Sequence, residues 1–236
     1  MSEPSRKPAA ELQPGRELAI WMMVMLVLGA LPWVTGFQER ALSQAVEAGS
    51  ARAERRGIGE VRDDQIRKAV KAQQDTQPFW KTLWLLGDLL LEPLAMALRT
   101  LGIAITFSAV AALAGRSIGF EPAFDDCARS QSYWALGLAV RVSLMLILGR
   151  NEVDTSLALV WTGGKITALS WLMMRQVDVF AILGWMSMAR GGWKRGQVSL
   201  ALAITVCVLY ALMEAGTRVA LEAAIGAVIR QRIMPE

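Results

Sequence analysis

Two opposite charges stand inside apolar sequence, where an ionised side chain is costly. Arg141 lies eight residues into the stretch Tyr133–Gly149, and Asp178 lies nine residues into the stretch Leu169–Ala189. At 1.5 Å per helical residue, each would lie roughly 12 Å from the end of its helix. An unpaired charge at such depth costs about 3 kcal/mol on insertion scales. We therefore expect Arg141 and Asp178 to pair, either as a structural bridge or as part of a transport or binding site.

Residues that could catalyse a reaction are scarce. The chain has no histidine, which excludes histidine metal ligands and histidine-dependent catalytic triads. An intramembrane aspartyl protease needs two deep aspartates, and only Asp178 qualifies. Asp125 and Asp126 beside Cys127 are the one weak candidate for lipid chemistry at an interface. The sequence therefore predicts a protein that is not an enzyme, with no catalytic, cofactor-binding or metal-binding residue.

Five apolar stretches punctuate the chain. A hydrocarbon core roughly 30 Å thick needs about 20 apolar helical residues. The fourth stretch is the least secure, because its uncharged part has 11 residues. It either spans with Arg175 and Asp178 included or is re-entrant. We expect an all-α, polytopic membrane bundle of about five transmembrane helices with interfacial amphipathic helices. The stretches are Leu18–Phe37, Leu94–Ala114, Tyr133–Gly149, Leu169–Ala189 and Val198–Ala215.

Polar segments divide the chain into five parts. Apolar residues at helical spacing after the first span predict two short amphipathic helices, and a solvated charged hairpin fits as well. Asp63 or Asp64 would begin the second of them. The parts are a disordered N-terminal tail (1–17), a first transmembrane anchor (18–37), a polar extension with an interfacial helix (38–93), a four-helix membrane core (94–216) and an amphipathic C-terminal tail (217–236).

The charge balance points to lipid and to other membrane proteins. With 25 basic and 21 acidic residues, the chain lacks the concentrated basic surface of a nucleic-acid binder. If the N-terminus is cytoplasmic, the short segments on the cytoplasmic side hold eight basic residues against five on the other side. Since cytoplasmic loops carry an excess of Lys and Arg, this count favours a cytoplasmic N-terminus.

Small residues recur at every fourth position in three of the stretches. Such stripes let helix backbones approach closely, because lipid offers no hydrophobic drive for helices to associate. They either pack this bundle or dock a partner helix, from another membrane protein or a second copy of the chain. The positions are Ala104, Ser108 and Ala112, then Ala135, Ala139 and Ser143, and finally Ser199, Ala203 and Ala211.

Two segments in the second half of the chain carry a family pattern. Val177–Gln197 (VDVFAILGWMSMARGGWKRGQ) contains an Asp-x-Phe step, an apolar run and a glycine-containing basic turn. Gly115–Gly137 contains a glycine-rich turn and an aromatic entry to the third stretch, without the proline usual there. Over about Leu94–Leu212 the chain resembles the Yip-domain family of polytopic membrane proteins, whose eukaryotic members interact with Rab GTPases. The matching motif residues are Asp178, Phe180, Gly191 and Lys194.

This resemblance implies five spans, a cytoplasmic N-terminus, a Yip-like four-helix core and no catalysis. The short N-terminal segment departs from the eukaryotic members, whereas the polar connection after the first span is similar to that of bacterial members. The resemblance thus implies an integral protein of the bacterial inner membrane. We expect a scaffold or adaptor for other membrane proteins; the alternative is an accessory subunit of an ABC-type or other membrane transport complex.

Overall fold

The computed structural model describes residues 15–57, 62–116, 119–150, 153–160 and 169–233, so the predicted N-terminal tail lies almost wholly outside it. Apart from turns and one isolated bridge between Ser156 and Asp178, these residues are helical. The elements are α1 (Arg16–Val34), α2 (Phe37–Gly57), α3 (Asp63–Asp75), α4 (Gln77–Leu86), the π-helical turn η1 (Gly87–Leu91), α5 (Glu92–Leu113), α6 (Phe120–Ser130), α7 (Ser132–Leu148), the 3-10 turn η2 (Leu157–Val160), α8 (Leu169–Arg175), α9 (Val179–Lys194) and α10 (Leu200–Ile233).

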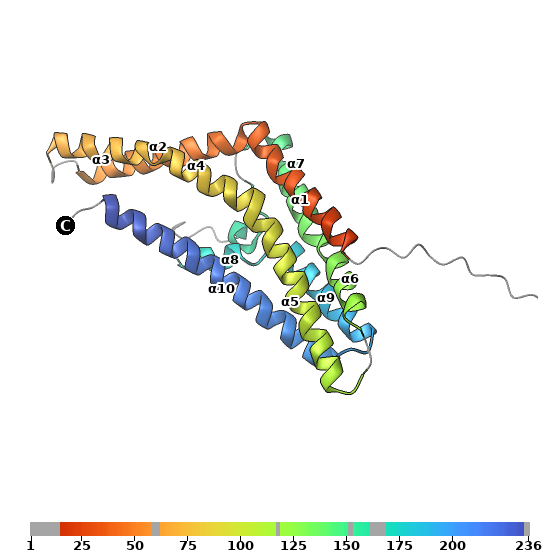
Figure 1. The fold of residues 1–236 in the computed structure, drawn as a ribbon. Helices are drawn as coiled ribbons and strands as arrows, with labels where there is room; N and C mark the ends of the chain where they lie inside the picture. The colour runs from red at the N-terminus through yellow and green to blue at the C-terminus, as the bar shows by residue number, and fades with distance from the viewer. Residues whose placement is uncertain (1–14, 58–61, 117–118, 151–152, 161–168, 234–236) are drawn as a thin grey trace, which may run out of the picture.

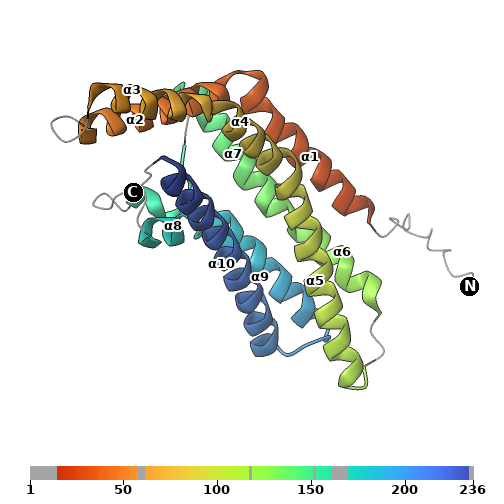
Figure 2. The same ribbon diagram turned by 60° about the vertical axis from the view of Figure 1, so that its left-hand side comes forward.

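The helices form a bundle with a projecting arm. In Figures 1 and 2, α1 and α7 run side by side, and α10 lies along α9 and α5, while α6 packs between α5 and α9. Helices α2 and α3 pack against each other and project from the end of the bundle opposite to the start of α1. We call α2 and α3 together the arm. The two amphipathic helices expected after the first span are therefore formed.

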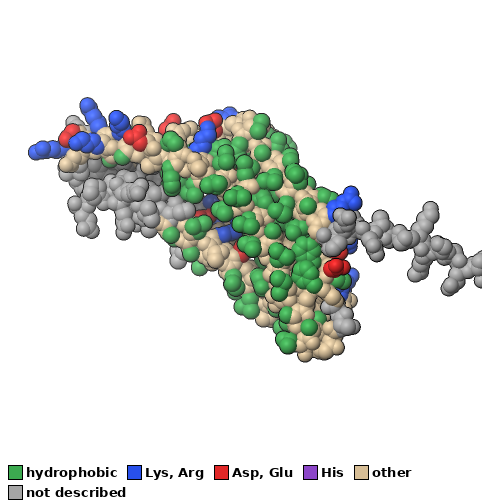
Figure 3. Space-filling model, viewed as in Figure 1, with side chains coloured by type: hydrophobic (Ala, Val, Ile, Leu, Met, Phe, Trp, Pro, Cys, Tyr) green, Lys and Arg blue, Asp and Glu red, His purple; other side chains and the backbone are tan. Residues whose placement is uncertain are grey.

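Four helical segments in the described ranges are long and apolar enough to cross a membrane. They are α1, the segment Asp64–Leu113 from α3 to α5, the α6–α7 segment and α10. The all-helical class is thus confirmed for the described residues, and four segments could span a membrane by length and composition, whereas the expected count of five spans is not confirmed. Figure 3 agrees with this class: one face of the bundle is largely apolar, and charged side chains gather on the arm and at the opposite end.

The predicted fourth stretch is not one helix. It is divided into α8 and α9, because Asp178 has an extended backbone (φ −105°, ψ 139°) and its side chain accepts a hydrogen bond from the Phe180 backbone N–H. An aspartate in this geometry caps a new helix instead of continuing the old one. With 16 residues, α9 is shorter than the roughly 20 that a full crossing needs.

Other boundaries also differ from the expected ones. The chain leaves the first span at Gly36, whose positive φ of 75° suits glycine, and α2 begins at the next residue. The expected interfacial helix before the second span is continuous with that span, interrupted only by η1. At the other end, α10 runs through the expected start of the C-terminal tail, so the core and this tail share one helix.

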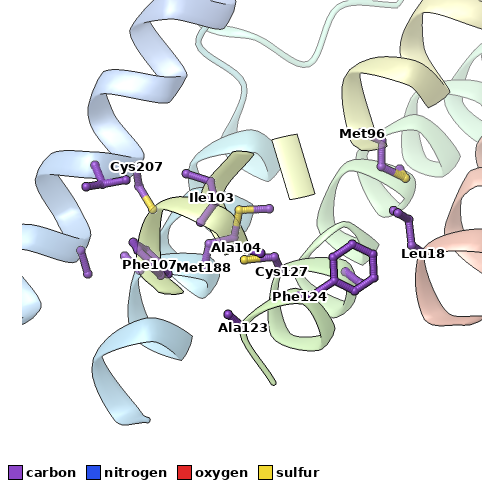
Figure 4. Close-up of a cluster of buried hydrophobic side chains, with 14 of the residues drawn as sticks. Leu18, Met96, Ile103, Ala104, Phe107, Ala123, Phe124, Cys127, Met188 and Cys207 are labelled. Atoms are coloured by element: carbon purple, nitrogen blue, oxygen red, sulfur yellow. The ribbon is translucent and has the colours of Figure 1, made fainter. Parts of the chain in front are cut away.

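Small and medium side chains fill the core, and large aliphatic ones point outward. Figure 4 shows Ile103, Ala104, Phe107, Cys127 and Met188 converging from α5, α6 and α9, and all are buried. Cys127 and Cys207 are both free and buried. By contrast, long side chains along α1, α5 and α10 are exposed, as Val27, Leu98 and Leu209 illustrate. This distribution suits a bundle that packs closely inside and meets lipid outside.

Close helix contacts depend on glycines that face aromatic rings. A Cβ atom added at Gly184 would clash with the Trp134 ring, and one added at Gly192 would lie 2.6 Å from Phe107. A Cβ atom at Gly137 would meet Phe180 at 2.9 Å. Since all three partners are bulky and packed, α9 reaches α7 and α5 only because these positions carry no side chain.

We therefore expect Gly184→Ala to destabilise the fold by about 1–3 kcal/mol, the usual cost of overpacking a well-packed site. Gly216→Ala is the matched control, because a Cβ atom there meets nothing within 4 Å and alanine favours a helix by about 0.5–1 kcal/mol. Unfolding of both variants in detergent micelles measures the difference. Equal effects of the two substitutions would contradict the proposed contact between α9 and α7.

Candidate functional site

The most concentrated polar feature inside the bundle surrounds Arg99 on α5. Its guanidinium donates two hydrogen bonds to the Glu214 carboxylate on α10, from Nε to Oε2 at 2.9 Å and from NH2 to Oε1 at 2.5 Å. Only 3% of the Arg99 side chain is exposed. This bidentate, charge-assisted geometry is the strongest form of the arginine–carboxylate pair.

Two further charges continue the pair toward the start of α5. Arg218, one helical turn beyond Glu214, donates from NH2 to the Glu214 Oε1 atom at 2.9 Å. It also donates to both carboxylate oxygens of Glu92, at 2.6 and 3.0 Å. The resulting chain, Glu92–Arg218–Glu214–Arg99, alternates in sign and has no net charge. We call these four residues the charge network.

Neutral side chains complete the surroundings of Arg99. Its NH1 atom donates to the Gln131 Oε1 atom at 2.8 Å, and Gln131 Nε2 donates to the Thr100 hydroxyl at 2.9 Å. The Arg99 guanidinium also lies 4.0 Å from the centre of the Trp134 ring and 5.6 Å from that of Trp185. The two indoles meet edge to face. Arg99 is thus held by carboxylate, amide and aromatic groups at once.

These contacts join four parts of the bundle. Arg99 and Glu92 belong to α5, and Glu214 and Arg218 belong to α10; Gln131 lies at the junction of α6 and α7, and Trp185 lies on α9. Because a buried charge is tolerated only when it is paired and hydrogen-bonded, the network fixes how these elements sit together. Its charged groups pair with one another, so the arrangement is better suited to holding the helices together than to catalysis. We call this role of the network a structural lock.

The sequence holds a signal for this network. An arginine five residues into the second apolar stretch is expected to extend its side chain to the membrane surface, but Arg99 is buried instead, so this expectation is wrong. Glu214 lies inside the stretch Val198–Ala215. Two intramembrane charges of opposite sign predict a pair, and a separation of 115 positions hides it from any local pattern.

The structure does bring Arg141 and Asp178 together, in a different setting from the one expected. The Arg141 NH2 atom lies 3.7 Å from Asp178 Oδ2, and the Arg141 side chain is 41% exposed. The Thr155 hydroxyl donates to the same carboxylate oxygen at 2.5 Å. Asp178 begins α9 instead of lying inside one long helix, so the two side chains meet without the continuous fourth span that the sequence predicted. Helix capping, as well as pairing, explains an aspartate here.

The small-residue stripes are only partly inside the bundle. One member of each stripe is fully buried, one is half-buried and one is exposed. An exposed member contributes no packing within the part of the chain that the structure describes, so the stripes do not pack this bundle along their whole length. The buried set is Ala104, Ala135 and Ala203, the half-buried set is Ser108, Ala139 and Ala211, and the exposed set is Ala112, Ser143 and Ser199.

The remaining motif residues lie along α9. Phe180 packs on Gly137 of α7, Gly191 faces the Asp126 carboxylate of α6, and Lys194 is exposed in the last turn. Asp126 forms an ion pair with Arg195, and its neighbour Cys127 is buried. Asp126 and Cys127 are thereby occupied by pairing and packing.

No family model, curated protein or solved structure matches this chain.

Removal of one charge from the network should be more damaging than removal of two. We expect Glu214→Met to cost about 3–5 kcal/mol, because it leaves Arg99 buried without its counter-charge. The double variant Arg99→Met/Glu214→Met should lose less than the single one. A double-mutant cycle of unfolding free energies in micelles measures this coupling. Additive losses would contradict the lock, and Lys81→Ala, in the exposed pair with Glu39, is the control for a weak bridge.

Substitutions at Asp178 can separate its cap from its charge. Asp178→Asn keeps an acceptor for the Phe180 N–H and removes the charge, whereas Asp178→Ala removes both. We expect Ala to cost about 1 kcal/mol more than Asn, the usual value of a helix cap. Arg141→Met isolates the ion pair and should cost less than about 1 kcal/mol, since Arg141 is partly exposed. Equal losses for Asn and Ala, measured by unfolding, would show that the charge dominates.

Proposed function

We propose that this chain is a non-enzymatic integral membrane protein that acts as a scaffold or adaptor for other membrane proteins. The observation that carries the proposal is the arm, a polar helical pair attached to an otherwise apolar bundle (Figure 3). Its α3 helix exposes Asp64, Arg67, Lys68 and Lys71. Such a surface contributes little to the stability of the bundle and is available to a partner outside the hydrocarbon core.

The base of the arm is firmly attached, as a docking element requires. Leu42 and Val46 of α2 are buried, and α2 packs against α4. Gln77 Nε2 donates to the Ser43 hydroxyl at 3.2 Å. At the corner between α1 and α2, Trp33 Nε1 and Gln38 Nε2 both donate to the Asp88 carboxylate, at 3.0 and 3.2 Å. A partner that holds the arm would therefore also hold the bundle.

We place the N-terminus in the cytoplasm and the chain in a bacterial inner membrane, in keeping with the resemblance to the Yip-domain family. The start of α1 and the ends of α5 and α9 bring basic residues to one end of the bundle, which supports this orientation. The arm then lies on the opposite side of the membrane. The basic residues of that end are Arg16, Arg116, Arg129, Arg190, Lys194 and Arg195.

An accessory subunit of a transport complex is the second candidate function. A shallow apolar groove on the outer side of α1 favours it, because a permease helix could occupy this groove. The charge network lies elsewhere, and neither this groove nor the hollow lined by Asp126 and Gly191 includes one of its residues. The chain would thus support a transport path without forming one itself. The groove is lined by Ile20, Met23, Val24, Val27 and Leu28.

Charge reversal on the arm tests the scaffold proposal. We expect the wild-type chain, purified in mild detergent after cross-linking in the membrane, to elute with a stoichiometric partner. Arg67→Glu/Lys71→Glu should reduce the partner by about tenfold, because like charges in an interface cost several kcal/mol. Arg16→Glu/Arg150→Glu is the matched control, with the same charge change at two exposed positions outside the arm. A solitary wild-type protein, or equal loss in both variants, would overturn the proposal.

A further inference from the structure

A polar hollow, separate from the apolar groove on α1, lies between α6 and α9 and outside the charge network. The two helices run antiparallel there: Ser130 faces Ser187, and Asp126 faces Gly191 and Arg195. The hollow measures about 260 Å³, somewhat less than the roughly 300–1,000 Å³ of pockets that enclose a drug-sized ligand. Its size suits one compact group. It is lined by Asp126, Arg129, Ser130, Ser187, Arg190, Gly191 and Lys194.

The floor of the hollow carries a hydroxyl that is free to donate. The Ser130 hydroxyl is buried and lies 2.8 Å from the Asp126 carbonyl oxygen, to which it donates. The Ser187 hydroxyl lies 3.0 Å from Ser130 Oγ. The Ser130 hydroxyl is also placed to donate to Ser187 Oγ, so Ser187 accepts there and its own proton is left for a group bound in the hollow.

The rim of the hollow is positively charged. Asp126 is neutralised by its ion pair with Arg195, and Arg129 lies 3.4 Å from Glu17 of α1. Arg190 and Lys194 are exposed, and neither forms an ion pair within the residues that the structure describes. The hollow therefore combines a hydroxyl donor with two unneutralised cations, which is the donor set for an oxyanion.

Two helices independently place the hollow at the level of the lipid headgroups. In α1 no charge occurs between Leu18 and Val34, so Glu17 marks the edge of the hydrocarbon, and Arg129 pairs with Glu17. In α9 the residues from Val179 to Ala189 are uncharged, and Arg190 is the first charge after them. Figure 3 shows charged side chains gathered at this end of the molecule, where α1 begins.

From this geometry we infer that the hollow between α6 and α9 binds the phosphate group of an anionic lipid headgroup. Arg190 and Lys194 supply the charge, and the Ser187 hydroxyl donates to a phosphate oxygen. The lipid tails then lie against the apolar surface that begins one turn deeper in the bundle. A lipid held here would fix α6 against α9, which the described contacts join through Ser130–Ser187 and Asp126–Arg195.

Lipid retention by the full-length protein tests the inference. The protein is released from nanodiscs of phosphatidylglycerol or phosphatidylcholine, and retained lipid is counted by native mass spectrometry. We expect wild-type protein to retain phosphatidylglycerol, and Arg190→Gln/Lys194→Gln to retain it at least about fivefold less, as each basic residue near anionic lipid contributes substantially. Arg67→Gln/Lys71→Gln makes the same charge change on the arm and should behave as wild type.

Two further measurements distinguish lipid binding in the hollow from general attraction between charges and from binding of a free anion. Ser187→Ala keeps every charge and should reduce retention by about threefold, the value of one hydrogen bond. Inorganic phosphate at millimolar concentration should not displace the retained lipid. Equal retention by wild-type protein and Arg190→Gln/Lys194→Gln, or equal retention of both lipids, would overturn the inference. Phosphate binding without lipid retention would also overturn it, in favour of a soluble anion.

Discussion

The placement of the helices depends on neutralising the guanidinium of Arg99, which is buried away from water. Arg99 lies in the bundle interior, and its bidentate pair with Glu214 fixes the relation between α5 and α10. Arg218 and Glu92 extend the pair, so each charge is balanced by the next along the row. In lipid, a departure of either helix would leave at least one charge without a counter-charge. Hydrophobic contact cannot supply this specificity, because lipid tails are as apolar as the helices.

Much of the architecture follows from local sequence. Apolar length predicted the helical class and segments long enough to cross a membrane, and the polar residues after Phe37 predicted helices that the structure forms as α2 and α3. Local sequence failed where a single side chain had two possible roles. Asp178 could be a buried charge or a helix cap, and its bond to the Phe180 N–H makes it a cap, which divides the expected fourth span.

Long-range partners account for the rest of what could not be predicted. Arg99 lies near one end of an apolar stretch, where its charge can be stabilised equally well by water at the surface or by a carboxylate. Only the fold decides which of the two it meets. The same holds for the small residues. Spacing identifies Ala104 and Ala112 as one stripe, yet Ala104 is buried while Ala112 is exposed. A four-residue period shows which residues share a face, and it does not show where the neighbouring helix ends.

The two polar clusters of the bundle differ in what they leave unsatisfied, and this difference separates stability from binding. In the charge network every cation has a carboxylate partner, so the cluster can hold helices and has little capacity left for a ligand. Between α6 and α9, Asp126 is already paired while Arg190 and Lys194 lack counter-charges among the described residues. An anion at the headgroup level would complete the second cluster as Glu214 completes the first. The lipid would then act as a removable part of the fold, which ties the arrangement of the bundle to the membrane around it.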